Sequence, residues 1–350
     1  MANVTGTNVT ESNTRAYVIL LIGILALAFT APWVRLSNFN PATSVILRAG
    51  FGLLALLPFA IKEFKDKGGL NRTGVLLSLL AGLFLGVDFL AWNMSIYFVG
   101  SGIASVLLNL QIIILPAMAF FIDKEKLPRT YFIVVPIMIL GVLMTGGVFE
   151  TGATTEGLDQ EPPTMLGIDI SVLGTIAGSI SGTCYAIYLY TSRKATMVNK
   201  GQFVQPIAWA TLAVLVAPLI YSIWSPRGID FTHGVQINGT LPVDPYVNLG
   251  DPITARNWFW VIVLGVLGQA MTWTFVQYGA VRLNSTIVAG LLLLSPILTV
   301  SVIAVVLFGE IPTLIQVLGV IVVLAAVAYQ NGLHRVVLNK ARGDSSARSP

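Results

Sequence analysis

Asp88 is the one carboxylate that the sequence places deep inside an apolar stretch, within GLFLGVDFLAWNMSIYF. Trp92 and Ser95 follow it four and seven residues later, so a helix would put all three side chains on one face. A carboxylate near the centre of a bilayer costs roughly 2.5 kcal/mol or more, and such groups normally face a cavity or a partner. The pattern predicts an acid beside an aromatic wall, which suits the binding of a polar solute or a proton.

Asp88 and Trp92 have counterparts 181 residues later in the chain. These counterparts are Gln269 and Trp273, with Gln277 one turn further on. One half of the chain then offers an acid and an indole to a solute, and the other half offers an amide and an indole. The alternative is structural: the acid caps a kink or pairs with a neighbouring helix, and the indoles pack. The sequence leaves both interpretations open.

Arg48 is the candidate partner of Asp88. It lies ~9 Å into its apolar stretch from one face of the membrane, and Asp88 lies ~21 Å from the opposite face, so both fall in the same half of the bilayer. If the two pair, Asp88 stays ionised. If Arg48 instead reaches the lipid headgroups, an unpaired Asp88 binds a proton more readily and can carry it. The two residues are therefore candidates either for ion coupling or for an ion pair.

Four further residues complete the candidate sites. Asn109 and Tyr185 are polar groups inside apolar stretches and are candidates for solute binding, although neighbouring helices could equally satisfy them. Glu125 and Glu310 each follow an apolar stretch at the expected cytoplasmic edge. We interpret these two glutamates as residues of a hairpin turn or a gate, and not as binding residues.

The composition requires a membrane protein. The chain is 55% hydrophobic and 10% charged, with a mean hydropathy of +0.81, and a soluble 37.5 kDa globule could not hide so many apolar side chains. The apolar runs are continuous over about 20 residues, whereas a transmembrane β-barrel shows short alternating segments. We therefore expect an all-α integral membrane protein.

A window of about 19 residues finds ten candidate transmembrane helices. They cover about 16 to 34, 42 to 61, 74 to 95, 102 to 122, 130 to 149, 168 to 191, 203 to 224, 257 to 279, 285 to 308 and 313 to 332. An even number of crossings puts both termini on one side, and that side holds most of the 20 Lys and Arg residues. The positive-inside rule makes it cytoplasmic. The expected location is the plasma or inner membrane.

The chain contains a weak internal repeat, since several residues recur 185 positions later. The matches in the first half are Ala104, Leu107, Leu108, Ala119, Glu125, Val135 and Val142, and those in the second half are Ala289, Leu292, Leu293, Ala304, Glu310, Val320 and Val327. Five is an odd number of helices, so the second copy enters the bilayer from the opposite side. The sequence predicts two inverted five-helix repeats that enclose a site between them.

The predicted boundaries follow from this repeat. Residues 1–149 form the first five-helix repeat, 150–167 an external acidic linker, 168–334 the second five-helix repeat and 335–350 a cytoplasmic basic tail. A second external loop, 225–256, is rich in Pro, Gly and Asn. Its length allows either a small lid or a disordered polar loop.

Enzymatic and metal chemistry are not indicated. Cys184 is the single cysteine, which excludes an intramolecular disulfide and a cysteine metal cluster, and His233 and His334 lie in polar segments. The membrane stretches therefore lack a general base of the histidine type and a zinc site, and the chain has no Walker-type loop for ATP. We expect no cofactor, no metal, no enzyme activity and no nucleic-acid partner.

The order of several short motifs resembles the drug/metabolite transporter (DMT) superfamily, EamA type. These motifs are DFLAW at 88–92, ASVLLNL at 104–110, LLSP at 293–296, and FGEIPT at 308–313 followed by Gln316 and Gly319. The resemblance implies ten helices, alternating access to a central cavity and movement of small organic solutes, often outward. Two departures are Gln111, where the second repeat has Pro296, and the long outer loop before the eighth helix.

The sequence thus predicts a secondary transporter, working as an exporter, of small organic metabolites such as amino acids or related compounds. Its expected partners are a small-molecule solute and the lipid bilayer, with proton coupling as an option. The alternatives are a passive facilitator or channel, and a membrane sensor subunit.

Overall fold

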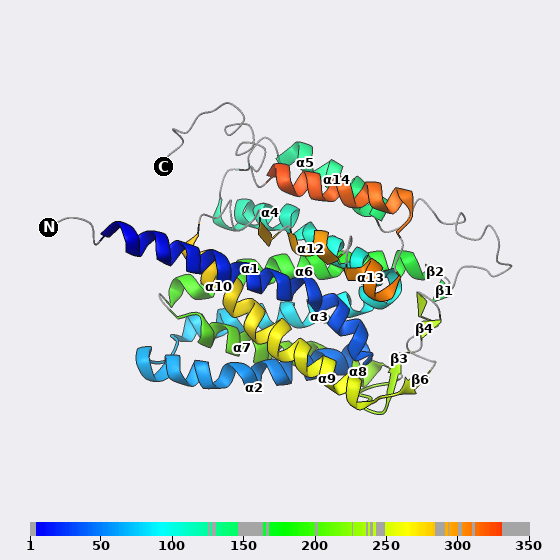
Figure 1. The fold of residues 1–350 in the computed structure, drawn as a ribbon, viewed down its shortest axis with the longest axis horizontal. Coiled ribbons are helices and arrows are strands. Elements are labelled where there is room, and N and C mark those ends of the chain that lie inside the picture. The colour runs from blue at the N-terminus through cyan, green and yellow to red at the C-terminus, as the bar shows by residue number, and fades with distance from the viewer. Residues whose placement is uncertain are drawn as a thin grey trace.

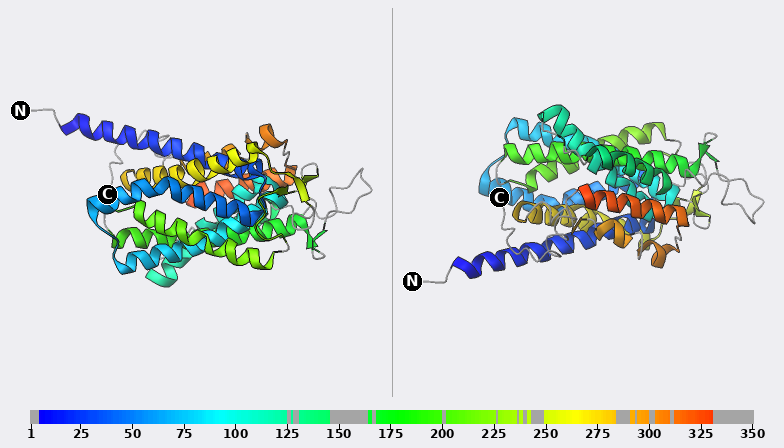
Figure 2. Two further views of the ribbon diagram at one scale, coloured as in Figure 1. Left: turned by 90° about the horizontal axis from the view of Figure 1, so that it is seen from below. Right: turned by 90° about the horizontal axis from the view of Figure 1, so that it is seen from above.

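The computed structural model is a bundle of helices with three short strand pairs (Figures 1 and 2). It describes residues 5–124, 127, 131–145, 164–165, 168–199, 202–225, 227–235, 237–238, 241–242, 249–283, 291–292, 294–299, 303–309 and 312–330.

The helices of the first half begin with the N-terminal α1. They are α1 (Thr5–Ser37), α2 (Pro41–Lys67), α3 (Arg72–Leu107), the 3-10 turn η1 (Leu108–Leu110), α4 (Gln111–Asp123) and α5 (Tyr131–Thr145). Those of the second half are α6 (Ile170–Val198), α7 (Val204–Val214), α8 (Val216–Trp224), α9 (Ala255–Val263), the π-helix η3 (Leu264–Met271), α10 (Thr272–Arg282), α12 (Leu294–Leu298), α13 (Ala304–Phe308) and α14 (Leu314–Gln330).

All three strand pairs are antiparallel and precede or follow helices of the second half. They are β1 (Thr164–Met165) with β2 (Ile168–Asp169), β3 (His233–Val235) with β6 (Leu249–Pro252), and β4 (Ile237–Asn238) with β5 (Leu241–Pro242).

Six helical segments among the described residues are long and apolar enough to cross a bilayer. They are Thr14–Ser37, Pro41–Lys67, Arg72–Asp123, Ile170–Val198, Val204–Trp224 and Ala255–Val276, and two shorter apolar helices are Tyr131–Thr145 and Leu314–Tyr329. The chain is therefore a multi-pass, all-α membrane protein, as its composition predicts. The predicted stretch at 285 to 308 is described only in parts, so the count of ten stays a prediction.

Local sequence signals fix where these helices begin and break. The side chains of Asn40 and Asn71 cap α2 and α3 by accepting hydrogen bonds from the third residue beyond each, at 2.9 and 2.6 Å. The 52 residues of Arg72–Asp123 would extend ~78 Å as one helix, more than twice the thickness of a bilayer core. Gly100 interrupts them with φ +86°, a conformation that suits glycine.

Glycines bring α3 close to the helices of the second half. A Cβ atom added to Gly86 would lie 2.6 Å from the carbonyl oxygen of Val214 in α7. A Cβ atom added to Gly174 of α6 would lie 2.6 Å from the Val99 side chain of α3. Such close approach leaves no room for a larger residue, so α3 is held between α6 and α7 by backbone contact.

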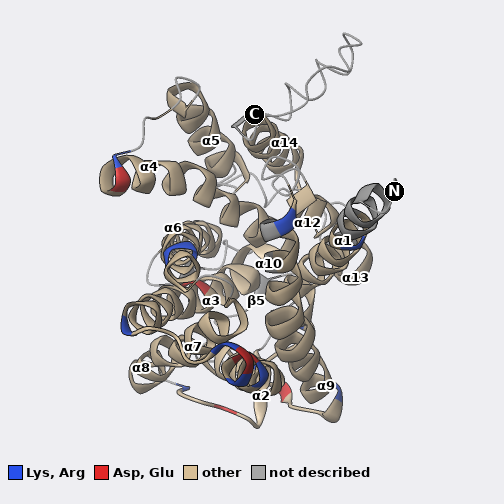
Figure 3. Ribbon diagram, turned by 90° about the vertical axis from the view of Figure 1, so that its left-hand side faces the viewer, with Lys and Arg blue, Asp and Glu red and all other residues tan. Residues whose placement is uncertain are grey.

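α1 begins at one end of the bundle, which we call the terminal end, and the strands lie at the other, the strand end (Figure 1). α14 begins near the strand end and runs toward the terminal end. Figure 3 views the terminal end, where the ribbon of α2, α4, α6 and α10 is coloured for Lys and Arg near the helix ends. The predicted inner loops carry the basic residues, so this clustering agrees with the expected distribution of charge.

Glu63 joins the two halves at the terminal end. Its carboxylate accepts hydrogen bonds from the backbone N–H groups of Phe203, Val204 and Gln205 at 3.1, 3.0 and 2.8 Å. These N–H groups open α7, where a helix has unpaired donors and favours a negative charge. The end of α2 is thereby fastened to the start of α7.

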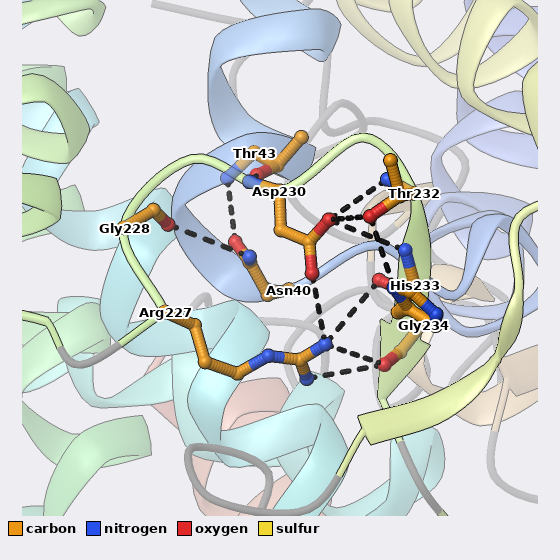
Figure 4. Close-up of polar contacts among 8 residues, drawn as sticks. All are labelled: Asn40, Thr43, Arg227, Gly228, Asp230, Thr232, His233 and Gly234. Atoms are coloured by element: carbon orange, nitrogen blue, oxygen red, sulfur yellow. Dashed lines mark hydrogen bonds and ion pairs between the residues drawn. The ribbon is translucent and has the colours of Figure 1, made fainter.

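At the strand end, part of the long loop 225–256 folds against the turn between α1 and α2 (Figure 4). Arg227 donates to Asp230 Oδ2 and to the carbonyl of Gly234, each at 3.1 Å. Asn40 donates to the carbonyl of Gly228 at 3.4 Å, and Thr43 Oγ1 accepts from the Asp230 backbone N–H at 3.0 Å. The described part of this loop is therefore docked on that turn through these hydrogen bonds, and the choice between a lid and a disordered loop stays a prediction.

Candidate functional site

Arg48 and Gln269 meet where α2 crosses the π-helix η3. The crossing is close because it is made by glycines: a Cβ atom on Gly52 would lie 2.8 Å from Gln269 Cβ, and one on Gly265 2.5 Å from Phe51 Cβ. Arg48 Nε donates to Gln269 Oε1 at 3.2 Å, and both side chains are buried. Gln269, the amide 181 residues after Asp88, therefore binds the buried arginine of the first half.

Gln269 also reaches a third helix. Its Nε2 donates to Thr211 Oγ1 of α7 at 3.3 Å, so this one amide connects α2, η3 and α7. The π-helical turn around it includes a hydrogen bond from Thr272 Oγ1 to the carbonyl of Leu267, five residues earlier, at 2.8 Å. π-helical turns are rare and occur frequently at functional sites.

Asp88 makes its hydrogen bond with α6. Ser181 Oγ donates to Asp88 Oδ1 at 2.5 Å, and both residues are buried. The described residues contain no ion pair within 4 Å between this carboxylate and Arg48. The ion pair that the sequence offers as one option is therefore not formed in this conformation.

Arg48 lies instead among aromatic rings. Its Cζ atom is 3.6 Å from the centroid of the Phe89 ring and 5.7 Å from that of Trp92, both from α3. The Arg48 side chain is 2% exposed, so it turns into the bundle and does not reach outward to headgroups. A guanidinium over an aromatic face is attracted by the ring quadrupole, which holds its plane in place.

A second aromatic group packs beside Phe89. Trp273 of α10 lies 5.8 Å from Tyr185 and 5.7 Å from Tyr188, measured between ring centroids, and the two tyrosines of α6 stack at 6.0 Å. Trp273 and Tyr188 belong to the same buried cluster as Phe89. We call the residues Arg48, Asp88, Phe89, Trp92, Ser181, Tyr185, Tyr188, Thr211, Gln269 and Trp273 the central cluster.

The remaining candidates from the sequence have other positions. Asn109 lies in the 3-10 turn η1 and donates to the carbonyl of Val106 at 3.0 Å, a local bond within the turn. Gln277 lies in α10, but its side chain is outside the described residues, as are Glu125 and Glu310 altogether. The predicted roles of these three residues stay predictions.

Ser181, Tyr188 and Thr211 are the polar members of the central cluster that are not among the candidates from the sequence. Ser181 stands four residues before Tyr185 and seven before Tyr188, so its helical face gives a usable signal. Thr211 has no such signal, because a lone threonine in an apolar helix usually bonds to its own backbone.

Known proteins resemble the chain at two levels. No curated protein matches it. A solved structure described as "Crystal structure of protein" shares 17% identity with a TM-score of 0.52, over 93% of this chain and 99% of that one, which is a likeness of fold. Residues 14–147 match the EamA-like transporter family. The family resemblance read from the motifs is thus confirmed: the chain carries an EamA-like transporter family domain of the DMT superfamily.

Proposed function

We propose that this EamA-family membrane transporter is a secondary transporter that exports small organic metabolites, with amino acids or related compounds as the lead class. It works by alternating access to a central site between two inverted five-helix halves. Asp88, Trp92, Asn109, Tyr185, Gln269, Trp273 and Gln277 are the proposed solute-binding residues, and Arg48 and Asp88 the proposed coupling pair.

The central cluster carries this proposal. Arg48 binds Gln269, and Asp88 binds Ser181, so each polar pair joins one residue of the first half to one of the second. Buried polar groups inside a membrane are costly and usually mark a substrate or ion pathway. Because both hydrogen bonds join the first half to the second, a movement of one half against the other would change both of them.

The packing of helices supports the inverted repeat. In the first half, α3 packs against α6 and α7; in the second, η3 and α10 pack against α1 and α2. Exchange of the halves converts the first arrangement into the second. Under the same exchange α5 and α14 are equivalent, and they pack on each other through Gly141, whose added Cβ would lie 2.9 Å from Val323. A twofold relation between halves predicts this pattern.

Counterflow in proteoliposomes tests the proposal. Vesicles loaded with unlabelled amino acids should accumulate the labelled compound transiently above its external concentration, and the rate should saturate. A carrier gives this overshoot because its site faces one side at a time, whereas a channel gives only equilibration. Linear, non-saturating flux would indicate the passive facilitator, and solute binding without flux would indicate a sensor subunit.

A further inference from the structure

We infer that Arg48 recognises a carboxylate on the transported solute. This inference rests on the proposed transport function and specifies its substrate class. It comes from a buried guanidinium whose hydrogen bond goes to a neutral amide and not to a carboxylate, at the place where α2 meets η3.

The positive charge of Arg48 is not neutralised by a hydrogen-bonded acid. A guanidinium stays protonated in proteins and offers five N–H donors. Arg48 Nε donates to the neutral amide of Gln269, and Nη1 has no hydrogen-bond partner among the described residues. Asp88 is near enough to interact electrostatically with Arg48 but forms no ion pair with it within 4 Å in the described part of the chain. The free N–H donors of a buried guanidinium favour an anion that arrives with the solute.

Other unused donors surround the same guanidinium. Trp92 Nε1 has no partner among the described residues, although the ring centroid is 5.7 Å from Arg48 Cζ. Ser44 stands one helical turn before Arg48, and its hydroxyl is likewise buried and unused within the described part of the chain. An indole N–H is a donor only and a serine hydroxyl can also donate, so both groups can bind an acceptor oxygen.

The charge of the site favours a carboxylate over a phosphate. Arg48 is the one Lys or Arg of the central cluster, and one guanidinium matches one carboxylate in charge and in planar geometry. A phosphate dianion would leave negative charge uncompensated beside Asp88. The same Asp88 retains acceptor capacity beyond its bond from Ser181, which suits an ammonium group on the same solute.

A comparison of matched compounds with and without a carboxylate shows how much that group contributes to binding. Purified full-length protein in lipid nanodiscs is titrated with the common amino acids, their C-terminal amides and their decarboxylated amines, and the unfolding temperature and tryptophan fluorescence are recorded. We expect at least one amino acid to raise the unfolding temperature, and its amide and amine to bind at least tenfold more weakly. Equal binding of the amide or amine overturns the inference, and so does a lack of response to every carboxylate.

Two variants test whether Arg48 is the receiving group. Arg48→Gln should abolish the response to the carboxylate, whereas Arg282→Gln, which removes an exposed arginine at the end of α10, should preserve it. If Arg48→Gln does not fold, Arg48→Lys keeps the charge without the planar fork and should bind the same carboxylate more weakly. Unchanged affinity in the folded variant overturns the inference.

The two proposals can fail separately. If a neutral or cationic solute shows counterflow and no carboxylate binds, the proposed transport function holds and the inference that Arg48 recognises a carboxylate fails. If a carboxylate binds in an Arg48-dependent way but no flux is measured, the inference about Arg48 holds and the proposed transport function fails.

Discussion

Arg48 and Gln269 are 221 residues apart in the chain, yet Arg48 Nε donates a hydrogen bond to Gln269 Oε1 at 3.2 Å inside the bundle. The bond connects α2 of the first half with the π-helix of the second. It places a charged donor on a neutral acceptor, which stabilises the packed halves while leaving the charge available to a ligand.

Loss of this acceptor should destabilise the protein. Gln269→Leu leaves the buried Arg48 Nε unpaired and should lower the free energy of unfolding by about 3 kcal/mol. Thr211→Val removes only the weaker bond to Gln269 Nε2 and should cost about 1 kcal/mol. Unfolding in detergent micelles, followed by tryptophan fluorescence, measures both. Equal losses in the two variants would contradict a special role for the arginine contact.

The tryptophans of the central cluster should matter more for binding than for folding. Trp92→Ala and Trp273→Ala should each weaken solute binding by at least tenfold while the yield of folded protein falls less, because both indole N–H groups are unused among the described residues. Trp224→Ala is the matched control, since Trp224 is 83% exposed at the end of α8. Loss of yield with normal binding by the surviving protein would make these residues packing residues.

Asp88 should carry any proton-linked step. Asp88→Asn keeps the shape of the side chain and can still accept from Ser181, but cannot change its charge, so pH-driven net transport should be lost while solute exchange remains. Transport from about pH 5 to about pH 9 is compared between wild type and variant. Asp123→Asn, which breaks an ion pair with Lys194 at the terminal end, is the control. Matching pH profiles of wild type and Asp88→Asn would exclude Asp88 as the proton carrier.

A reporter fused before α1 or after α14 should be active in the cytoplasm, and one inserted in 150–167 should be active outside. Figure 3 shows described Lys and Arg residues near the terminal ends of α2, α4, α6 and α10, and such residues remain on the cytoplasmic side during insertion. Fusions that report by enzymatic activity on only one side of the membrane measure this directly. An external signal from the C-terminal fusion would reverse the proposed orientation.

Asp230 should hold the described part of the loop 225–256 in a pH-dependent way. Burial raises the pKa of its carboxyl, but hydrogen bonds from Thr232, His233 and Arg227 outweigh this and lower the pKa from 3.8 to about 2. A lowered pKa in the folded state stabilises the loop above about pH 4, and this contribution is lost as the pH falls toward 2. Hydrogen exchange of the Thr232 and His233 amides reports the order of the loop.

At neutral pH, Asp230→Asn should exchange these two amides faster than wild type, and the difference should shrink toward pH 2. Asp251→Asn in β6 is the control, because Asp251 is exposed. Slow exchange in Asp230→Asn at neutral pH would show that the loop is held by its other contacts.

Periodicity and composition predicted the class of the protein and part of the central cluster. Trp92 and Trp273 were found because they repeat at helical and inter-repeat spacing, and a helix converts that spacing into a shared face. The partners of the two polar residues were not predictable, since Arg48 meets Gln269 and Asp88 meets Ser181 only through the packing of distant helices. The π-helical turn likewise has no signature in LGVLGQAM, because it depends on how η3 packs against α2.

The contacts of α3 have a consequence for the order of events during synthesis. Gly82 and Gly86 of α3 pack against backbone atoms of α7, and Asp88 binds Ser181 of α6, so these partners are made only after the first half has left the ribosome. Until the second half is made, Gly82, Gly86 and Asp88 of α3 lack the helices that they contact in the complete protein. The first half is therefore incomplete until the second half is inserted. Co-expression of the two separated halves should restore the folding that neither half reaches by itself.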